Sequence, residues 1–407
     1  MLTARRLFTA ALALAALHAV DDAFVGRQPG VGLGQHALAG VLSLVLAAGA
    51  VYAFPRVRPA LRATMALALG LPALVNGAMH VVHVSWEGPE RSDLTGLGAA
   101  LAGVGLLGLA AWIPFGGRAE AAATARRRWV NRVVAVPALL VVLVAVVIPV
   151  AFSVFELHKP REDVGEPPSA AYRDVSFEST DGLKLSGWYR PARNGATVLL
   201  VHGGGGDRNG AQDHAKMLER HGYGILMYDS RGRGRSEGSP NSYGWDWEKD
   251  ADGAMDWLAE QDAGRIGALG LSSGADTVLD IASTRDDLDA IVSDGAAGRT
   301  LEDFKRISPK VTVGSLSGWV MFQAIDVMSG DEPSRTLEDL VGDIEAPTLL
   351  VSAGTKDERD ANVLFDAAAT AETEHWNLPD AGHTSAVRDF PREYEERVTG
   401  FFDERLG

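Results

Sequence analysis

The first 155 residues are dominated by long apolar runs. Five of them stand out, at residues 7–25, 36–54, 63–84, 94–115 and 133–155. Four are long enough to cross a hydrocarbon core of about 30 Å as helices, which takes roughly 20 residues. The first run is interrupted by Asp21 and Asp22 and follows the stretch TARR, so a signal peptide is the alternative; the closeness of the next run favours an uncleaved span. The pattern predicts an all-α transmembrane domain at residues 1–155.

A polar, proline-bearing linker at 156–170 is followed by short β-branched runs that alternate with amphipathic segments. RDVSFEST and LKLSGWYR, joined by Asp181-Gly182, predict a hairpin, and the apolar run TVLLV predicts a strand buried on both faces. Further strand-like runs are GILMYD, RIGALGL, LDAIVSD, PTLLVSAG and TEHWNLPD, with helix-like segments near 209–221, 247–261, 273–284, 361–371 and 388–404. Residues 171–407 are therefore predicted to form an α/β domain with a mainly parallel sheet and helices on both faces.

Charge divides the chain at the same place. Residues 1–155 hold six acidic and twelve basic side chains, whereas the remaining residues hold 47 acidic and 26 basic ones. The acidic excess argues against nucleic-acid binding, which needs a basic surface. The chain has no cysteine, which excludes a thiol nucleophile, a disulfide framework and a thiolate metal site.

The basic residues among the apolar runs predict the membrane orientation. Arg5 and Arg6 precede the first run. Between the second and third runs lie Arg56, Arg58 and Arg62. Between the fourth and fifth runs lie Arg118, Arg126, Arg127, Arg128 and Arg132. Because basic loops stay inside, the N-terminus is expected to be cytoplasmic and the segment after the fifth span extracytoplasmic. The protein is thus predicted to be an integral cell-membrane protein.

A few polar side chains interrupt the apolar runs. His80 and His83 are spaced i, i+3, and His18 and Asp22 are spaced i, i+4. A metal or haem site or a proton path is conceivable, since polar groups in spans are costly. Pairing between helices is the favoured interpretation, because such pairs specify a metal only weakly. We name no metal or cofactor site.

In the second half, polar motifs follow the predicted strands. HGGGGDRNG, DSRGRGRSEG and GLSSG follow three successive strands, and GTKD and DAGH follow two later ones. Chemistry in such sheets lies at the carboxyl ends of the strands. This ordered set resembles the α/β-hydrolase superfamily over nearly all of residues 171–407. With FESTDGLKLSGWYRPA before the first motif, it resembles in particular the membrane-anchored Bem46-like and serine-aminopeptidase-like hydrolases.

The resemblance implies a nucleophile and a base. Ser272 is the central residue of Gly270-x-Ser272-x-Gly274, where flanking glycines avoid collisions at a sharp strand-to-helix turn. A serine hydroxyl needs a base to take its proton. His383 in DAGHTSA matches the Gly-His position of the family, whereas His202 in the HG turn is interpreted as structural.

The triad acid is expected between the nucleophile and the histidine in chain order. Asp357 in SAGTKDERD matches the family's G-x-x-D spacing counted from Gly354, so it is favoured. Glu358 and Asp360 are its close competitors.

The oxyanion donors implied by the resemblance are main-chain N–H groups. Ser273 follows the nucleophile, and Gly204 in HGGGG is the second donor, with Gly203 as the alternative. No Gly-Lys-Ser/Thr follows the glycine run and GRGRSEG fails the G-x-G-x-x-G spacing, so nucleotide binding is disfavoured and no cofactor is predicted.

Other family positions are interpreted as supporting residues. Asp229, Arg231 and Ser236 match a loop that braces the site. Asp276 departs from the small residues usual after the elbow: a role in the first helical turn is favoured, and a carboxylate facing a cationic or hydroxylated substrate is the alternative. The long segment 294–343 is expected to be a cap that shapes an acyl pocket, the alternative being a plain helical pair; it carries Phe304, Trp319, Met321, Phe322 and Met328.

These features predict a membrane-anchored serine hydrolase that cleaves a small-molecule or lipid-like carboxylic ester through an acyl-serine intermediate. A peptidase or amidase with the same residues is the nearest alternative. A non-catalytic binding domain on a membrane protein, or a transport or sensing role for the spans, is less favoured.

Overall fold

The chain separates into two units in a computed structural model that describes residues 2–25, 33–86, 91–116, 141, 143–157, 159, 161, 163–241, 243–307, 309–310, 313–329 and 335–407. The helical unit comprises Met1–Arg27, Val31–Pro160 and Lys310–Gly330. The α/β unit contains Arg161–Pro309 and Asp331–Gly407. Each unit is described below by itself.

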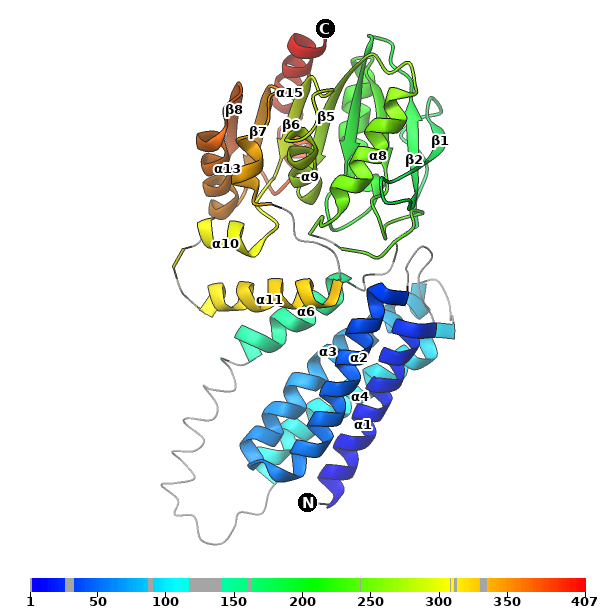
Figure 1. Cartoon of the computed structure of the whole chain (residues 1–407), viewed down its shortest axis with the longest axis vertical. Coiled ribbons are helices and arrows are strands. Elements are labelled where there is room, and N and C mark those ends of the chain that lie inside the picture. Colours follow the sequence, from blue (N-terminus) through cyan, green and yellow to red (C-terminus); the bar gives the residue numbers. More distant parts are fainter. Residues whose placement is uncertain are drawn as a thin grey trace. The chain divides into compact units, whose positions relative to one another are not determined.

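Long apolar helices build the helical unit (Figure 1). They are α1 (Leu2–Val20), α2 (Leu33–Ala53), α3 (Pro59–Trp86), α4 (Arg91–Gly116), α6 (Ile148–Leu157) and α11 (Val313–Ser329), with π-helical turns at Asp21–Val25 and Leu143–Val147 and a 3-10 turn at Phe54–Arg56. Three described segments are long and apolar enough to cross a membrane: Thr3–Val25, Pro59–Ala78 and Leu94–Ile113. Shorter apolar helices lie at Gly40–Arg56 and Leu143–Val154. The basic loop before the predicted fifth span and the first part of that span, residues 133–140, lie outside the described residues.

Helices α3 and α4 pack through glycine. A Cβ at Gly77 would overlap the backbone of Ala100 on α4, and a Cβ at Gly103 would overlap the backbone of Leu74 on α3. Small residues at such crossings let two helices in an apolar medium approach closely enough for their backbones to touch. Close backbone packing thus holds α3 against α4 at these two glycines.

Polar side chains within the helical unit pair across helices. The ring nitrogens of His18 on α1 lie 3.2 Å from Oγ1 of Thr95 on α4 and 3.3 Å from Oδ1 of Asn76 on α3. The hydroxyl of Thr95 donates to Asp21 at 2.6 Å, and the His80 ring meets that of His18 edge to face. The favoured interpretation, pairing between helices, is confirmed for His18. The side chains of Asp22 and His83 lie outside the described residues.

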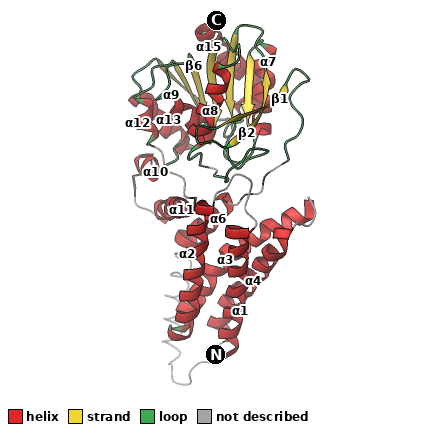
Figure 2. Cartoon of the chain, turned by 45° about the vertical axis from the view of Figure 1, so that its right-hand side comes forward, coloured by secondary structure: helices red, strands yellow, loops and turns green. Residues whose placement is uncertain are grey.

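The α/β unit is built on one eight-stranded sheet (Figures 1 and 2). Its strands are β1 (Arg173–Glu178), β2 (Lys184–Arg190), β3 (Ala196–Val201), β4 (Gly224–Tyr228), β5 (Arg265–Leu271), β6 (Ala290–Asp294), β7 (Thr348–Ala353) and β8 (Thr373–Leu378). The strand order is β1-β2-β4-β3-β5-β6-β7-β8, parallel from β4 onward, with β2 antiparallel to both of its neighbours. The predicted hairpin and the mainly parallel sheet are both confirmed.

Helices cover both faces of this sheet. The helices of the unit are α7 (Gln212–Arg220), α8 (Trp247–Ala259), α9 (Ser273–Ala282), α10 (Leu301–Ile307), α12 (Leu337–Val341), α13 (Lys356–Ala368), α14 (Ala386–Asp389) and α15 (Pro391–Leu406). Val198 and Leu200 pack with α7 and α15 on one face, whereas Leu199 and Val201 pack with α8, α9 and α13 on the other. Strand β3 is therefore buried on both faces, as its unbroken apolar run predicts.

The predicted cap is divided between the two units. Helices α10 and α12, at its two ends, belong to the α/β unit, whereas Lys310–Gly330, with α11, belongs to the helical unit. Phe304 lies on α10, and the other four aromatic and methionine residues of the segment lie on α11. Only one of the 17 residues of α11 is charged, so this helix buries apolar surface against other apolar helices.

Candidate active site

Ser272 stands at a sharp turn between β5 and α9. Its backbone has φ 54° and ψ −120°, a conformation that a non-glycine residue adopts at a cost of roughly 1–3 kcal/mol. The turn is held by its main chain: the N–H of Ser272 donates to the carbonyl of Asp294 at 2.8 Å, and its carbonyl accepts from the N–H of Ala275 at 2.7 Å. The turn presents the hydroxyl at the carboxyl end of the parallel strands.

The flanking glycines are required by this turn. A Cβ at Gly270 would overlap the carbonyl oxygen of Gly274, and a Cβ at Gly274 would overlap the carbonyls of Val201 and His202. Any larger residue at either position would push β5, α9 or the end of β3 apart. The Gly-x-Ser-x-Gly pattern therefore has the steric cause that the sequence predicts.

His383 lies beside Ser272. Its Nε2 is 2.9 Å from Oγ of Ser272, and its Nδ1 is 2.7 Å from Oε2 of Glu358. A carboxylate only accepts hydrogen bonds, so Nδ1 carries the proton and Nε2 is free to accept the proton of Ser272. The ring lies close to the Cα of Gly295, where a Cβ would crowd it. Ser272 and His383 thus form the pair that the sequence predicts.

The acid beside His383 is Glu358, so the prediction of Asp357 is wrong. Asp357 is exposed to solvent in the first turn of α13, whereas only 2 % of the Glu358 side chain is exposed. Oε1 of Glu358 accepts from the N–H of Ala353 at 2.6 Å, while Oε2 accepts from His383. Each oxygen of Glu358 therefore has a donor, and the carboxylate is fixed. Asp360, the other competitor, pairs with Lys356 and Arg359 instead.

The error follows from where α13 begins. The helix starts at Lys356, five residues before the predicted segment, because the side chain of Thr355 caps it by accepting from the N–H of Glu358. Within a helix from that start, the buried residues are Glu358, Ala361, Asn362 and Phe365, which is the i, i+3, i+4, i+7 spacing of one helix face. The Thr355-x-x-Glu358 capping pattern, continued by that face, is the sequence signal that would have found Glu358.

The carboxylates around His383 set its charge. The hydrogen bond that Nδ1–H of His383 donates to Glu358 raises the pKa of His383 above its ordinary value, burial opposes this rise, and the negative charges of Glu358, Asp294 and Asp276 add to it. A base with a raised pKa binds the serine proton more strongly. The surroundings therefore favour an imidazolium, the charge that His383 would carry during proton transfer.

The glycine run after β3 lies beside the elbow. A Cβ at Gly203 would lie 3.3 Å from the Cβ of Ser272 and also 3.3 Å from the carbonyl oxygen of Leu271. The carbonyl of Gly204 is turned toward Arg233, which donates to it at 2.8 Å. Gly204 and Ser273 as oxyanion donors remain a prediction, and Gly203 stays the alternative.

His202 has a structural role, as predicted. The N–H of Ser230 donates to its Nε2 at 3.0 Å, which leaves the proton on Nδ1, and Nδ1 donates to the carbonyl of Gly203 at 2.7 Å. Burial lowers the pKa of His202 to about 4, so the ring is neutral. It ties the glycine run after β3 to the segment after β4.

The loop after β4 is a buried network of charged groups. Asp229 accepts from the guanidinium of Arg208 at 2.7 and 2.9 Å, and Arg231 pairs with Asp250 at 2.7 Å. The hydroxyl of Ser236 donates to the carbonyl of Asp229 at 2.5 Å. Asp229, Arg231 and Ser236 thus hold this loop together, in keeping with the structural interpretation of these residues.

Asp276 is buried in the first turn of α9. Burial raises its pKa to about 7, opposed by Arg299 and by hydrogen bonds from the N–H groups of Ala297 and Gly298. Its Oδ1 has no hydrogen-bond partner in the described part of the chain. The carboxylate therefore ties the loop after β6 to α9. The sequence predicts only that it lies in the first turn of the helix.

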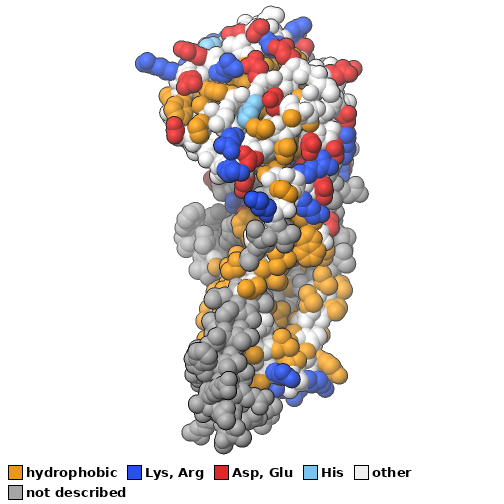
Figure 3. Space-filling view, turned by 90° about the vertical axis from the view of Figure 1, so that its left-hand side faces the viewer, with side chains coloured by type: hydrophobic (Ala, Val, Ile, Leu, Met, Phe, Trp, Pro, Cys, Tyr) orange, Lys and Arg blue, Asp and Glu red, His pale blue; other side chains and the backbone are white. Residues whose placement is uncertain are grey.

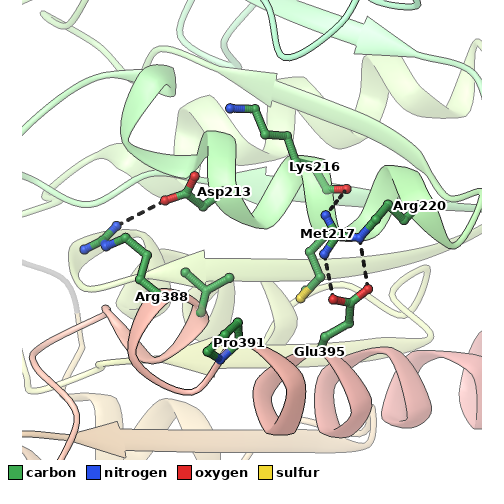
Figure 4. A pocket seen from close by; sticks show the side chains of 8 residues that line it. Asp213, Lys216, Met217, Arg220, Arg388, Pro391 and Glu395 are labelled. Atoms are coloured by element: carbon green, nitrogen blue, oxygen red, sulfur yellow. Dashed lines mark hydrogen bonds and ion pairs between the residues drawn. The ribbon is translucent and has the colours of Figure 1, made fainter.

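A separate hollow of about 320 Å³ lies between α7 and the C-terminal helices (Figure 4). Its rim carries two ion pairs, Arg388–Asp213 at 3.4 Å and Arg220–Glu395 at 2.6 Å. Ser272, Glu358 and His383 are not among its lining residues. This hollow is therefore distinct from the site around Ser272. No group of three or more His, Asp and Glu in the described chain is arranged to hold a metal ion.

Comparisons with known proteins find similarities over parts of this chain. Residues 180–362 match the family model described as X-Pro dipeptidyl-peptidase (S15 family). The chain is 37% identical over 132 residues to an uncharacterized protein of Mycobacterium tuberculosis (strain ATCC 25618 / H37Rv), covering 30% of this chain and 46% of that protein. It is 39% identical over 71 residues to the polyketide transferase grgF of a Penicillium species, covering 17% of this chain and 24% of that protein.

One solved structure shows the extent of the fold. An esterase of Pyrococcus furiosus superimposes with a TM-score of 0.50 and 23% sequence identity, over 62% of this chain and 99% of the esterase. The chain spans about half the length of the curated relatives it matches. The resemblance to the α/β-hydrolase superfamily is thus confirmed: the α/β unit has that fold, and the helical unit has no family assigned.

Proposed function

We propose that this chain is a membrane-anchored serine hydrolase that cleaves a carboxylic ester through an acyl intermediate on Ser272. The observation that carries the proposal is the continuous hydrogen-bonded series from Glu358 to His383 to Ser272, at 2.7 and 2.9 Å, ending on a strained elbow. A serine so placed has its proton acceptor in position before substrate binds.

The steps follow from these contacts. Nε2 of His383 takes the proton of Ser272 as Oγ attacks the ester carbonyl, and Glu358 stabilises the imidazolium that forms. The N–H groups of Ser273 and Gly204 would hold the negative oxygen of the tetrahedral intermediate. His383 then gives its proton to the departing alcohol, leaving the acyl group on Ser272. Water repeats the same sequence in reverse to release the acid.

The proposed membrane orientation places the N-terminus inside and the α/β unit outside the cytoplasm. The aromatic rings of Phe8 and Phe54 stack at 3.9 Å, so Arg5 and Arg6 share one end of the helical unit with Arg56 and its neighbours. Basic residues gathered at one end of apolar helices favour a cytoplasmic location for that end.

A fluorophosphonate probe and a short p-nitrophenyl ester would test the proposal on the full chain. Ser272→Ala is expected to abolish labelling and to lower kcat/KM at least about 10⁴-fold, because the nucleophile is lost. Ser273→Ala keeps its main-chain N–H and should stay within about tenfold of the parent. In intact cells, a charged, membrane-impermeant probe should label Ser272 only if the α/β unit is extracytoplasmic.

The results that would contradict the proposal are distinct. Persistent labelling of Ser272→Ala would remove Ser272 as the nucleophile. Loss of labelling in Ser273→Ala alone would assign the nucleophile to the neighbouring residue. Absence of labelling in the folded parent chain would favour a binding domain without chemistry.

A peptidase is the second candidate, because the matched family model describes an X-Pro dipeptidyl-peptidase. The same serine, histidine and carboxylate can cleave an amide. Turnover of an X-Pro p-nitroanilide and of the short ester by the same preparation separates the two. A kcat/KM for the amide equal to or above that for the ester would favour the peptidase.

A further inference from the structure

Helix α11 belongs to the helical unit, although the residues before and after its segment in the sequence belong to the α/β unit. It packs in the helical unit, where Ser317 donates to the carbonyl of Val144 at 2.7 Å and Ser153 donates to the carbonyl of Met321 at 3.1 Å. Phe322 and Ile325 are buried at this contact. The insertion is therefore anchored to the π-helical turn and α6 by its inner face.

The outer face of α11 is mainly apolar, and Gln323 and the one charged residue of the helix, Asp326, are also exposed on it. Leu316, Trp319 and Val327 are 44 %, 47 % and 44 % exposed, and the spacings of three and eleven residues from Leu316 place them on one side of the helix. The segment it packs on exposes apolar side chains in the same way: Val144, Val146, Ile148 and Phe152. Apolar surface of this extent is costly in water.

Exposed large hydrophobic side chains are nearly absent from the described part of the α/β unit. Of 24 large hydrophobic side chains that are exposed in the described chain, Val363 is the one in the α/β unit. Leu316, Trp319 and Val327 thus match the exposure of the helices that are long and apolar enough to cross a membrane. Figure 3 shows hydrophobic side chains gathered over the helical unit and charges of both signs over the α/β unit.

Both ends of the insertion start from the residues of the active site. It leaves β6 at Asp294, whose carbonyl holds the N–H of Ser272, and returns through β7 to Ala353, whose N–H is held by Glu358. A segment that departs from the nucleophile elbow and returns at the triad acid therefore passes through the apolar helical unit.

We propose that the outer face of α11 contacts the acyl chains of the bilayer, and that the ester cleaved at Ser272 is carried by a membrane lipid. The second part rests on the proposed hydrolase function, whereas the first part does not. The occupant of this face is thus lipid rather than water, another protein or a second copy of this chain.

The absence of cysteine from the chain allows a direct test of the first part. A single nitroxide label is introduced by Leu316→Cys or Val327→Cys in the full chain, reconstituted in vesicles of phosphatidylcholine and phosphatidylglycerol. Val363→Cys, an equally exposed apolar position on α13, is the matched control. Oxygen concentrates in the bilayer and a nickel chelate stays in water, so the oxygen-to-nickel accessibility ratio is expected to be several-fold higher on α11 than at position 363.

Three results would overturn the lipid contact. A ratio on α11 equal to that at position 363 would place the face in water. A label that neither reagent reaches would mean that protein covers it. Dipolar broadening between labels would assign the face to a second copy of the chain. Each readout is independent of catalysis.

Two esters with the same leaving group test the second part. p-Nitrophenyl acetate is supplied in water and p-nitrophenyl palmitate within the vesicles. The triple variant Leu316→Ser, Trp319→Ser, Val327→Ser is expected to lower palmitate turnover about tenfold, in keeping with the loss of several apolar contacts, and to leave acetate turnover within about twofold. Gln323→Ser, on the same exposed face, removes no apolar side chain and should change neither rate.

The outcomes separate the two proposals. A parent chain that cleaves neither ester contradicts the hydrolase function but leaves the labelling result intact. A parent chain that cleaves acetate, with palmitate turnover unaffected by the triple variant, keeps the hydrolase function and overturns the lipid substrate.

Discussion

The α/β unit and the helical unit use opposite means to hold their structure. In the α/β unit, buried charges are paired: Arg208 with Asp229, Arg231 with Asp250, and Glu358 with His383. In the helical unit, glycines bring backbones into contact, and large apolar side chains such as Leu94 and Leu101 are 78 % and 71 % exposed. One unit hides apolar surface from water, and the other presents it.

The difference shows which interactions stabilise a fold in water and which stabilise helices in an apolar medium. A buried ion pair in a soluble domain is costly to break, because removing one partner leaves an uncompensated charge. Between helices in an apolar medium, burial of apolar surface gives little advantage over lipid, so close packing decides stability. The contrast predicts that polar variants damage the α/β unit most and volume variants damage the helical unit most.

The largest expected effect comes from the carboxylate beside His383. Glu358→Gln keeps the shape but removes the charge that holds Nδ1–H and stabilises the imidazolium, so kcat should fall by about 10³–10⁴-fold. Asp357→Asn removes a neighbouring carboxylate that is exposed, and should leave kcat within about twofold. Steady-state turnover of a short p-nitrophenyl ester measures both.

One result for the two variants, Glu358→Gln and Asp357→Asn, would contradict this assignment. If Asp357→Asn lost activity and Glu358→Gln kept it, the acid would act from the solvent-exposed turn of α13. That outcome would restore the G-x-x-D assignment and leave Glu358 the structural role of accepting from the N–H of Ala353. Fluorophosphonate labelling of each variant checks that Ser272 is still correctly placed.

The sequence predicted most of the α/β unit because its signals are local. The run at β3, the Asp181-Gly182 turn and the two glycines around Ser272 each depend on neighbours a few residues away. His383 was identified by chain order and by a motif. Glu358 required the start of α13, which is set by the side chain of Thr355, and helix ends are the least certain part of a pattern.

The position of α11 could not be predicted in the same way. Its 17 residues contain one charge, which fits a cap over an acyl pocket as well as a helix packed on the helical unit. The choice depends on partners about 170 residues away in sequence, such as Val144 and Ser153. Composition showed that α11 is apolar, but only the tertiary contacts show which apolar surface it joins.

A volume variant should break the helical unit alone. Gly103→Ala places a methyl group against the backbone of Leu74 and should destabilise the α3–α4 pair by about 1–3 kcal/mol, the range for overpacked contacts. Gly105→Ala, two residues away with open space around it, should be neutral or stabilise the helix by up to about 1 kcal/mol. Thermal unfolding in detergent, followed by circular dichroism, compares the two.

The ester-hydrolysis readout keeps this test specific. Heat inactivation of the active site should follow the α/β unit and change little in Gly103→Ala. Inactivation at a lower temperature, in step with the loss of helical signal, would mean that the two units unfold together. The two units would then differ in their chemistry but not in their stability.

The smallest expected effect is a shift in the pH profile. His383 must be neutral to accept the serine proton, and the hydrogen bond that it donates to Glu358, together with the nearby carboxylates, raises its pKa. Activity should therefore fall with decreasing pH earlier than for a free imidazole.

Asp294→Asn removes one of those charges while still accepting from the hydroxyl of Tyr394, so the acid limb of kcat/KM should move to lower pH. Asp357→Asn, whose carboxylate is exposed, should leave the limb in place. An unmoved limb in Asp294→Asn would show that Glu358 alone sets the charge of His383, and that the buried carboxylate after β6 serves the elbow only through its main-chain carbonyl.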